Sequence, residues 1–213
     1  MRIIRNEMDF YMKPILNIKP MFKLSALTLL SAVIAVGCSQ TPNTEAKITT
    51  HEMTASSATP SNSTKVVEVH AVSAAGIGQK IGAIQLQDSP QGLVIQTQLT
   101  QLTTGEHGFH IHEKGSCEPA EKEGKMTAAL AAGGHFNPQK APNHGTPNTG
   151  HLGDLPVLTV DAQGNANTTS VAPRLKLADV EGLAIMVHAG GDNYSDAPKP
   201  LGGGGDRVAC GII

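Results

Sequence analysis

Histidine is the residue type that stands out in this sequence of 213 residues. Seven of its nine histidines fall between His107 and His188, and two of them form the triplet His110-Ile111-His112. In a β-strand, His110 and His112 would project from the same face and could bind one metal ion together, whereas Ile111 would point into a core. A single His-x-His pair is a weak signal, so the prediction of a metal site depends on the side chains that follow.

Further side chains of metal-binding type follow the triplet along the chain. Together with the triplet they are too many for one four-coordinate ion and sufficient for two. Imidazole nitrogen suits both zinc and copper, and a carboxylate is a common additional ligand of zinc. Affinity along the divalent series peaks at Cu²⁺, so a site built from nitrogen alone favours copper. The added side chains are His135, His144, His151, Asp154, His188 and Asp192.

Short apolar segments separated by turn residues must position these ligands. In the segment 93–102, Leu93, Ile95 and Thr97 alternate with more polar positions, which is typical of a strand with one wetter face. Many short strands at hairpin spacing predict an all-β sandwich or barrel. The other expected strands are 66–72, 81–86, 155–160 and 184–188, with turns at 75–78, 89–92 and 161–164.

Two segments depart from this pattern. Residues 175–180 hint at a helix, but Pro173 argues against a long one. Between 113 and 150 the periodicity disappears, while Gly, Pro, His and charged residues become frequent. A loop of that length in a folded domain is usually functional.

The amino-terminal part of the chain predicts export. Residues 24–37 form an uncharged apolar stretch after Lys23, with the length of a signal-peptide core rather than of a membrane span. We therefore expect a signal peptide over 1–37. Residues 1–20 are unusual upstream of such a segment, so Met21 is the alternative start.

The predicted signal peptide is followed by a cysteine and a polar segment. Ala35-Val36-Gly37-Cys38 resembles a bacterial lipobox, in which Cys38 would be acylated; ordinary cleavage nearby is the alternative. Residues 38–64 are rich in Ser, Thr and Pro and predict a flexible tether. The folded domain is expected over 65–213.

Overall composition excludes several other classes of protein. Lys and Arg number 16 against 18 Asp and Glu, and no basic stripe is visible, so no nucleic-acid partner is expected. A hydrophobic content of 39% is too high for a fully disordered chain. With no Trp, 2 Tyr and 4 Phe, the core must be mainly aliphatic.

Four sequence blocks, taken together, resemble the bacterial copper–zinc superoxide dismutases. The similarity covers essentially the whole of 65–213. It implies an eight-stranded Greek-key β-barrel, an immunoglobulin-like sandwich with long metal-binding and electrostatic loops. It also implies that the chain dismutates superoxide to oxygen and hydrogen peroxide and protects the cell envelope. The blocks are Gly-Phe-His-Ile-His at 108–112, Gly-His-Phe-Asn-Pro at 134–138, His-Leu-Gly-Asp-Leu at 151–155 and the glycine-rich stretch 202–211.

The resemblance implies a role for individual residues. Two metal ions would share His135 as a bridging imidazolate. Asp192 would link His110 to His144 and fix the orientation of both rings. Arg207 would guide superoxide, and His135 would take part in catalysis. The implied copper ligands are His110, His112, His135 and His188, and the implied zinc ligands are His135, His144, His151 and Asp154.

The cysteines and the net charge add two expectations. With Cys38 assigned to lipid, Cys117 and Cys210 are expected to form a disulfide, as paired cysteines of exported proteins usually do. Residues 65–213 carry a net charge of −4, so attraction of superoxide requires a local positive patch. The candidate side chains for such a patch are Lys114, Lys122, Lys125 and Lys199.

Alternatives to the enzyme are a copper or zinc store or chaperone on the same barrel, and a copper-only relative. Arg207 and the shared-ligand pattern favour the enzyme, and the presence of the full zinc set disfavours a copper-only site. The expected location is the periplasm, with tethering to the outer membrane through Cys38 as one option. The sequence leaves open whether the protein is a monomer or a homodimer.

Overall fold

The computed structural model describes residues 63–213. The predicted signal peptide, the alternative start at Met21, the lipobox cysteine Cys38 and the tether up to residue 62 lie outside the described residues. The first strand begins at Thr64, next to the expected start of the domain. Within the described part of the chain, no helix is long and apolar enough to cross a membrane.

Regular secondary structure within residues 63–213 is mainly β, with one α-helical turn, where Pro173 argued against a longer helix, and two 3-10 turns. The elements are β1 (Thr64–Ser73), β2 (Gly76–Ser89), β3 (Gly92–Leu99), β4 (Gly105–His107), β5 (Phe109–His112), β6 (Ala120–Lys122), β7 (Lys125–Thr127), η1 (Leu130–Ala132), β8 (Leu158–Val160), β9 (Thr169–Ala172), α1 (Leu177–Val180), β10 (Ala184–His188), η2 (Leu201–Gly203) and β11 (Arg207–Ile212).

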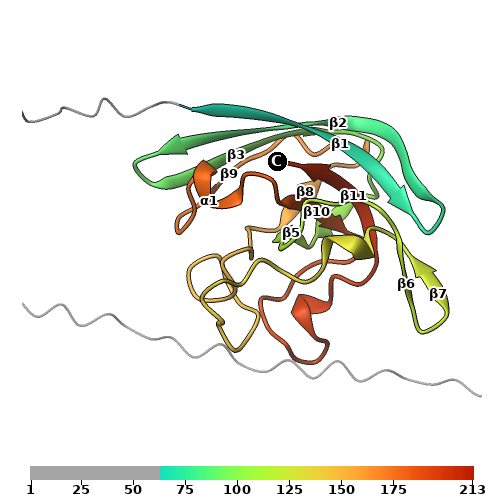
Figure 1. Cartoon of the computed structure of the whole chain (residues 1–213). Coiled ribbons are helices and arrows are strands. Elements are labelled where there is room, and N and C mark those ends of the chain that lie inside the picture. Colours follow the sequence, from blue (N-terminus) through green and yellow to red (C-terminus); the bar gives the residue numbers. More distant parts are fainter. Residues whose placement is uncertain (1–62) are drawn as a thin grey trace, which may run out of the picture. The chain divides into compact units, whose positions relative to one another are not determined.

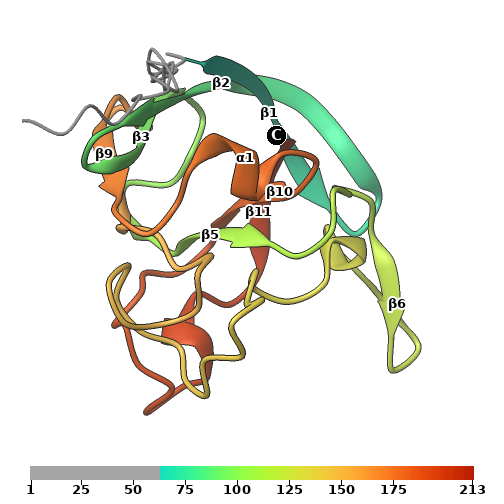
Figure 2. The same cartoon turned by 60° about the vertical axis from the view of Figure 1, so that its left-hand side comes forward.

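The main sheet is antiparallel and curls into a half-barrel, with the strand order β5-β10-β11-β1-β2-β3-β9 (Figure 1). β4 pairs with β8 in a second small sheet. Because only Gly108 separates β4 from β5, the two act as one interrupted strand that joins both sheets. Counted in this way, eight strands build the barrel, and β6–β7 is a separate hairpin that projects from it (Figure 2). The predicted all-β barrel class is confirmed.

An aliphatic core fills the half-barrel. In β3, Leu93, Ile95, Thr97 and Leu99 are buried while the intervening glutamines are exposed, as the alternation predicted. Each fully buried Leu or Ile side chain contributes about 1.5–3 kcal/mol through removal of its apolar surface from water. Because side chains alternate along a strand, this burial also fixes which side chains of each neighbouring strand face the core and which face away from it.

The first turn lies at other residues than the sequence predicts. The turn lies at 74–75 rather than 75–78, and β2 already begins at Gly76. The hydroxyl of Ser73 accepts a hydrogen bond from the Ala75 N–H at 3.2 Å, which closes the short connection. The register of β1 against β2 shifts on both sides of His70, and such bulges cannot be read from the hydrophobic pattern.

Two predicted strands are longer than those observed. The strand expected over 93–102 ends at Leu99, because Gln101 adopts a positive φ of 64° that breaks the extended conformation. The strand expected over 155–160 begins only at Leu158, because Pro156 has no N–H to donate to a neighbouring strand.

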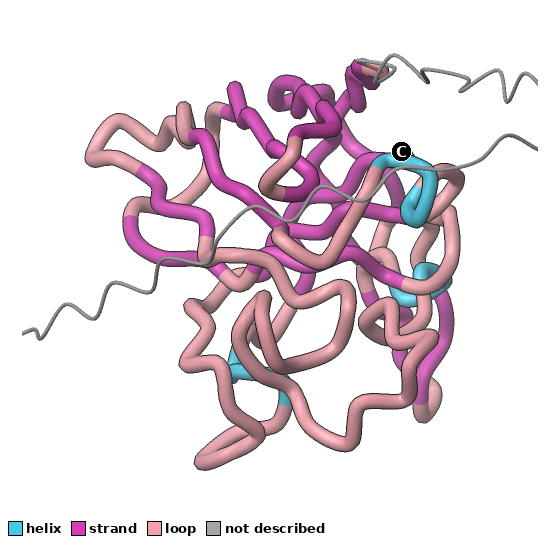
Figure 3. The backbone as a smooth tube through the Cα atoms, turned by 90° about the vertical axis from the view of Figure 1, so that its left-hand side faces the viewer, coloured by secondary structure: helices cyan, strands magenta, loops and turns pink. Residues whose placement is uncertain are grey.

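The long loops gather at one end of the barrel. The loop between β7 and β8 and the loop between β10 and β11 lie side by side below the strands in Figures 1 and 2. Figure 3 shows the same division, with strands in one half of the domain and loops in the other. A backbone hydrogen bond from Asn193 to Gly202 closes the second loop upon itself at 3.1 Å. The barrel thus presents its two longest loops to one site.

The predicted disulfide is present between Cys117 and Cys210, whose Cα atoms lie 5.7 Å apart. It joins the segment between β5 and β6 to β11. The sulfur atoms close a chain segment with a sequence separation of 93 residues.

Removing this disulfide is expected to destabilise the metal-free protein strongly. Closing so long a segment stabilises the folded state by about 4–5 kcal/mol in the chain-entropy treatment of the unfolded state. Cys117→Ala combined with Cys210→Ala should lower the free energy of unfolding in urea by that amount. Reduced wild-type protein is the control and should match the double variant. A loss below about 1 kcal/mol would contradict the expectation.

Candidate metal centre

β5 and β10 position the first group of histidines. The two strands are neighbours, with His110 opposite Met186 and His112 opposite Ala184. Phe109 and Ile111 enter the core, so both histidines of the triplet point to the loop side, as predicted.

The first group is compact and buried. His188 ends β10, and an isolated bridge pairs His135 with His112. Each of the four side chains offers one ligand atom within 4.8 Å of the ligand atoms of the others. The group consists of His110, His112, His135 and His188.

Hydrogen bonds fix which ring nitrogen of each histidine faces the group. His112 Nδ1 donates to the Gly133 carbonyl at 3.0 Å, and His188 Nδ1 donates to the Gly205 carbonyl at 3.2 Å. Their two Nε2 atoms lie 3.4 Å apart. His110 is turned the other way, because its Nε2 contacts a carboxylate and its Nδ1 is left facing the group.

Asp154 is the centre of the second group. Its Oδ1 lies 2.9 Å from His135 Nδ1, 3.1 Å from His144 Nδ1 and 3.4 Å from His151 Nδ1. A tetrahedral zinc ion with bonds of about 2.0 Å would have ligand atoms about 3.3 Å apart. The three distances from Asp154 Oδ1 are therefore close to those expected between ligand atoms of a tetrahedral site, and His135 belongs to both groups.

His151 is the outermost member of this second group. Its side chain is 12% exposed, whereas the side chain of Asp154 is fully buried. The set around Asp154 whose ligand atoms all lie within 4.8 Å of one another contains His110, His135 and His144, and His151 is not part of it.

Asp192 links the two groups through the Nε2 atoms of two histidines, whose Nδ1 atoms are the ones that face the groups. Its Oδ2 accepts a hydrogen bond from His110 Nε2 at 2.7 Å, and its Oδ1 accepts one from His144 Nε2 at 2.8 Å. The Tyr194 N–H also donates to Oδ1, at 2.7 Å. The side chain of Asp192 is completely buried, so these contacts satisfy a carboxylate without water.

Two glycines allow the loops to approach these carboxylates. A Cβ atom at Gly150 would lie 2.2 Å from Asp154 Oδ2, and a Cβ atom at Gly202 would lie 2.0 Å from Asp192 Oδ1. Gly202 also has a positive φ of 72°, which side chains rarely adopt. Both positions therefore require glycine while the carboxylates keep their places.

Burial keeps the first group of histidines neutral. It lowers the pKa of His110 to about 4, against the opposing hydrogen bond with Asp192, and lowers the pKa of His188 to about 3. Burial also lowers the pKa of His112 and of His135. Neutral imidazole is the form that binds a metal ion, so each of these four rings can bind one ion without losing a proton.

The carboxylates produce the opposite shift at His144. Burial alone would lower the pKa of His144, but its close contact with the Asp154 carboxylate and its hydrogen bond with Asp192 raise it to about 9. Burial likewise opposes ionisation of the two carboxylates, but their hydrogen bonds with histidines outweigh it and hold both pKa values well below the usual range. The ionised Asp154 therefore gives the second group a negatively charged ligand, which the first group lacks, whereas His144 must release its extra proton when a metal ion binds.

Arg207 lies at the edge of the first group. It lines a cleft of about 230 Å³ together with His112, His135 and His188. Its Nη1 donates to the Ala129 carbonyl at 2.5 Å, and its Nη2 donates to the Gly133 carbonyl at 2.6 Å. Of its five N–H groups, three take no part in these two contacts.

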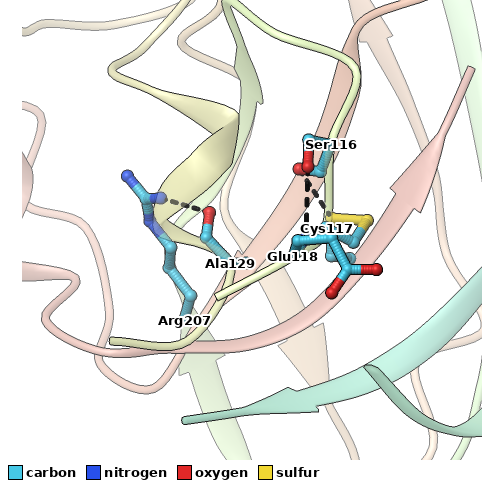
Figure 4. Close-up of a disulfide and its surroundings, with 6 residues drawn as sticks. Ser116, Cys117, Glu118, Ala129 and Arg207 are labelled. Carbon is cyan, nitrogen blue, oxygen red and sulfur yellow. Dashed lines mark hydrogen bonds between the residues drawn. A yellow bond between two sulfur atoms is a disulfide. The ribbon is translucent and has the colours of Figure 1, made fainter. Parts of the chain in front are cut away.

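The disulfide fixes the loop that holds Arg207 in place. Figure 4 shows the Arg207 guanidinium against the Ala129 carbonyl, and beside it Cys117 in the chain segment that leads to Ala129. Cys210 lies three residues after Arg207 on β11. The covalent bond therefore joins the strand of the arginine to the loop of its acceptors.

The four lysines proposed for a positive patch are dispersed. Lys125 lines a hollow that also borders Arg207, and Lys199 lines another next to Asp192. Lys114 and Lys122 are exposed but border neither of these hollows. None of the four lines the cleft itself, so the positive side chain nearest to the histidines is Arg207.

Two other histidines have structural contacts. His107 is buried, and its two ring nitrogens contact the carbonyls of His188 and Thr103 at 2.6 and 2.7 Å. His70 is partly exposed and its Nδ1 donates to the Gly78 carbonyl at 3.1 Å. Neither residue belongs to the two groups.

Sequence reasoning missed several residues that support the site. Asp196 accepts hydrogen bonds from the backbone N–H groups of His144 and Leu201, at 2.9 and 3.0 Å. The Tyr194 hydroxyl accepts the Val157 N–H at 2.9 Å. These contacts use backbone groups, which every residue has, so no residue-type pattern could have predicted them.

The residues of both groups fit the metals that the sequence predicts. The buried Nδ1 atoms of His110, His144 and His151 have no hydrogen-bond partner, although two of them lie close to Asp154 Oδ1. Such unsatisfied nitrogens are unfavourable inside a protein, and a bound metal ion would satisfy them. The all-nitrogen first group suits copper, and the second group, with its carboxylate, suits zinc.

Comparisons with known proteins agree with this chemistry. The family model described as Copper/zinc superoxide dismutase (SODC) matches residues 80–213. The superoxide dismutase [Cu-Zn] of Escherichia coli (strain K12) is 53% identical over 149 residues, which cover 69% of this chain and 86% of the relative. Superoxide dismutase [Cu-Zn] 2 of Salmonella typhimurium is 54% identical over 149 residues, with the same coverage of both chains.

Solved structures show the same likeness. The Cu/Zn superoxide dismutase from Brucella abortus superposes with a TM-score of 0.70 at 47% identity, covering 71% of this chain and 99% of its own. The monomeric copper, zinc superoxide dismutase from Salmonella enterica gives 0.65 at 50% identity, with the same coverage.

Proposed function

The chain belongs to the copper/zinc superoxide dismutase family, and on that premise we propose which of its residues hold each metal and guide the substrate. Its reaction is the dismutation of superoxide to oxygen and hydrogen peroxide, with copper and zinc as cofactors. The observation that carries the proposal is the position of His135 between two buried groups of ligand atoms.

The proposed ligand sets follow the two groups. Bound copper would supply the one-electron oxidation and reduction that the reaction needs, and zinc would contribute fixed charge and structure. The spacing around Asp154 Oδ1 supports His151 as a zinc ligand in preference to His110, whose Nδ1 would serve copper. We assign copper to His110, His112, His135 and His188, and zinc to His135, His144, His151 and Asp154.

His135 is placed to hold and release a proton. Its Nδ1 faces Asp154 at 2.9 Å, so its Nε2 is the nitrogen left for the copper side. A ring shared by two cations can lose both protons near neutral pH, because each cation stabilises the anion. Whenever Nε2 is not held by copper, it would be the atom that takes a proton from water and passes it to the peroxide product.

Arg207 would attract and orient superoxide. Apart from its metal ions, the domain has a net charge of −4, which disfavours approach of superoxide at long range, and a permanent cation at the cleft would add local attraction. The guanidinium has three N–H groups left, and it can present two of them to the oxygens of a diatomic anion. The two carbonyl contacts of Arg207 hold it at the cleft without neutralising it.

Metal analysis combined with a superoxide-consumption assay tests this proposal. One copper and one zinc per chain with fast turnover would support it. Copper bound without turnover would instead favour a store or chaperone and would contradict the assigned chemistry.

Replacing Arg207 with alanine should slow the enzyme without removing its metals. We expect a fall of about tenfold or more in kcat/KM, because local electrostatic attraction raises association rates by 10- to 1,000-fold. The dependence of the rate on ionic strength should weaken in the same variant. Pulse radiolysis at several salt concentrations measures both effects.

Arg207→Lys is the matched control. It keeps the charge but cannot make both carbonyl contacts and present two N–H groups together, so an intermediate rate is expected. Unchanged kinetics in the alanine variant, at full copper and zinc content, would eliminate the guiding role.

We further propose that the protein works in the periplasm and protects the cell envelope. The apolar stretch at 24–37 supports export, and a disulfide is typical of an oxidising compartment. Cys38 would be acylated and hold the domain at the outer membrane through the tether 38–64. Cys38→Ser should then release the protein from the membrane fraction into the soluble periplasm. A cytoplasmic protein that retains Met1 would contradict the proposal.

Homodimer formation stays a prediction. Val66, Ile77 and Ile212 are large exposed apolar side chains that line one hollow beside the disulfide, and they support contact with a second copy. Against it, the relative from Salmonella enterica is titled monomeric. Sedimentation equilibrium of the tether-free domain separates the two states by mass.

A further inference from the structure

Arg174 donates hydrogen bonds to the backbone of the loop between His144 and His151. Its Nε donates to the Pro147 carbonyl at 2.7 Å. Its Nη2 donates to the carbonyls of Gly150 and His151, at 2.9 and 2.7 Å. Three carbonyls of one short loop therefore converge on two nitrogens of one guanidinium.

Buried residues and a hydrogen-bonded turn fix the position of Arg174. It lies between β9 and α1, next to Ala172 and Leu175, whose exposures are 2% and 1%. The Leu175 N–H donates to the Ala172 carbonyl at 3.2 Å and closes a turn around Arg174. The loop at 145–151, by contrast, contains no strand or helix of its own. The contact thus anchors an irregular loop to the barrel.

The anchor matters most for the position of His151. It is the most exposed of the proposed zinc ligands, with 12% of its side chain accessible. Its backbone N–H donates to Asp154 Oδ2 at 2.8 Å, and its carbonyl accepts from Arg174. Because both of its peptide groups are held, only rotation of the side chain is left to direct Nδ1 towards the zinc position.

The contact depends on the shape of the guanidinium. In the described part of the chain, Arg174 forms no ion pair with a carboxylate, so its charge is directed to neutral carbonyls. A planar guanidinium presents adjacent N–H groups on one edge, whereas a lysine ammonium has one nitrogen on a flexible stem. Lysine could reach one or two of the carbonyls but could not align all three.

We propose that Arg174 is a positioning residue for zinc, which holds the backbone at 145–151 so that His151 Nδ1 faces Asp154 Oδ1 before the metal binds. The inference rests on the zinc ligand set proposed above. Partners that orient a metal ligand from outside typically change metal affinity by 10- to 100-fold when they are removed. Copper has no ligand in this loop and should bind as before.

Zinc competition with a chromogenic chelator tests the proposal on metal-free protein. Arg174→Ala is expected to weaken zinc binding by about 10- to 100-fold, and Arg174→Lys by an intermediate factor. Lys176→Ala is the matched control, since Lys176 belongs to the same segment but donates to the Ser89 carbonyl instead. It should keep wild-type zinc affinity, and copper affinity should be unchanged in all three variants.

Cobalt in the zinc site supplies a second readout that a change in stability alone would not move. Four-coordinate Co²⁺ absorbs visible light more strongly than six-coordinate Co²⁺, so a displaced His151 should weaken the bands in Arg174→Ala. Wild-type zinc affinity and wild-type cobalt bands in that variant would overturn the proposal, even if its melting temperature fell. If Arg174→Ala does not fold, the same comparison is made with Arg174→Lys.

One further variant separates this inference from the proposed function. His151→Ala should lose zinc affinity if His151 is a ligand. If His151→Ala binds zinc normally, the ligand set is wrong and the role of Arg174 falls with it. If His151→Ala loses zinc while both Arg174 variants keep it, only the positioning role is overturned.

Discussion

Replacing His188 with alanine is expected to remove copper and abolish superoxide dismutation while zinc stays bound. The substitution deletes one of the four nitrogen donors of the first group and leaves the second group complete. Loss of a partner outside the ligand set already lowers metal affinity or activity by 10- to 100-fold, so loss of a ligand should lower both by about 100-fold or more. Metal analysis and pulse radiolysis of the same sample measure the two effects together.

The fold should survive this substitution. The contact between His107 Nδ1 and His188 uses the His188 carbonyl, which alanine retains, so the end of β10 keeps its place. His70→Ala is the matched control, because His70 lies on β1 outside both groups. Full copper content and near-normal turnover in His188→Ala would contradict the proposed copper set.

Asp192→Asn is expected to weaken copper more than zinc. Asp192 Oδ1 accepts two hydrogen bonds, from His144 Nε2 and from the Tyr194 N–H, so the single oxygen of asparagine should stay on that side. The amide NH₂ group would then face His110 Nε2 and donate to it. This moves the proton of His110 to Nδ1, the atom proposed to bind copper. The expected loss of copper affinity is about 10- to 100-fold.

Matched variants give this prediction its control. Asp161→Asn makes the same chemical change in an exposed turn and should bind both metals normally. Asp192→Ala removes both contacts and should weaken both metals to a similar extent. Equal losses of copper and zinc in Asp192→Asn would rule out the proton shift at His110.

The local part of the site could be predicted from the sequence because it follows strand geometry. His110 and His112 share a face since they are two residues apart, and the apolar residues Phe109 and Ile111 show which face packs into the core. The ligand sets followed from four blocks of residues that resemble a known family. The strand limits were less predictable, because one backbone conformation at Gln101 ended β3 early.

Contacts with backbone groups could not be predicted. The Gly133 carbonyl receives both Arg207 Nη2 and His112 Nδ1, which joins the anion guide to a proposed copper ligand. Every residue has a carbonyl, so only the folded chain shows which one lies at this point. The same holds for the loop carbonyls that face Arg174.

Electron paramagnetic resonance of the protein with Cu²⁺ in the first group and Co²⁺ in the second measures directly whether one imidazolate joins both metals. If His135 bridges them, its ring couples the unpaired electrons, and the copper signal seen with diamagnetic zinc should be lost. A copper signal of full intensity beside fully loaded cobalt would show two separate centres and would contradict the account.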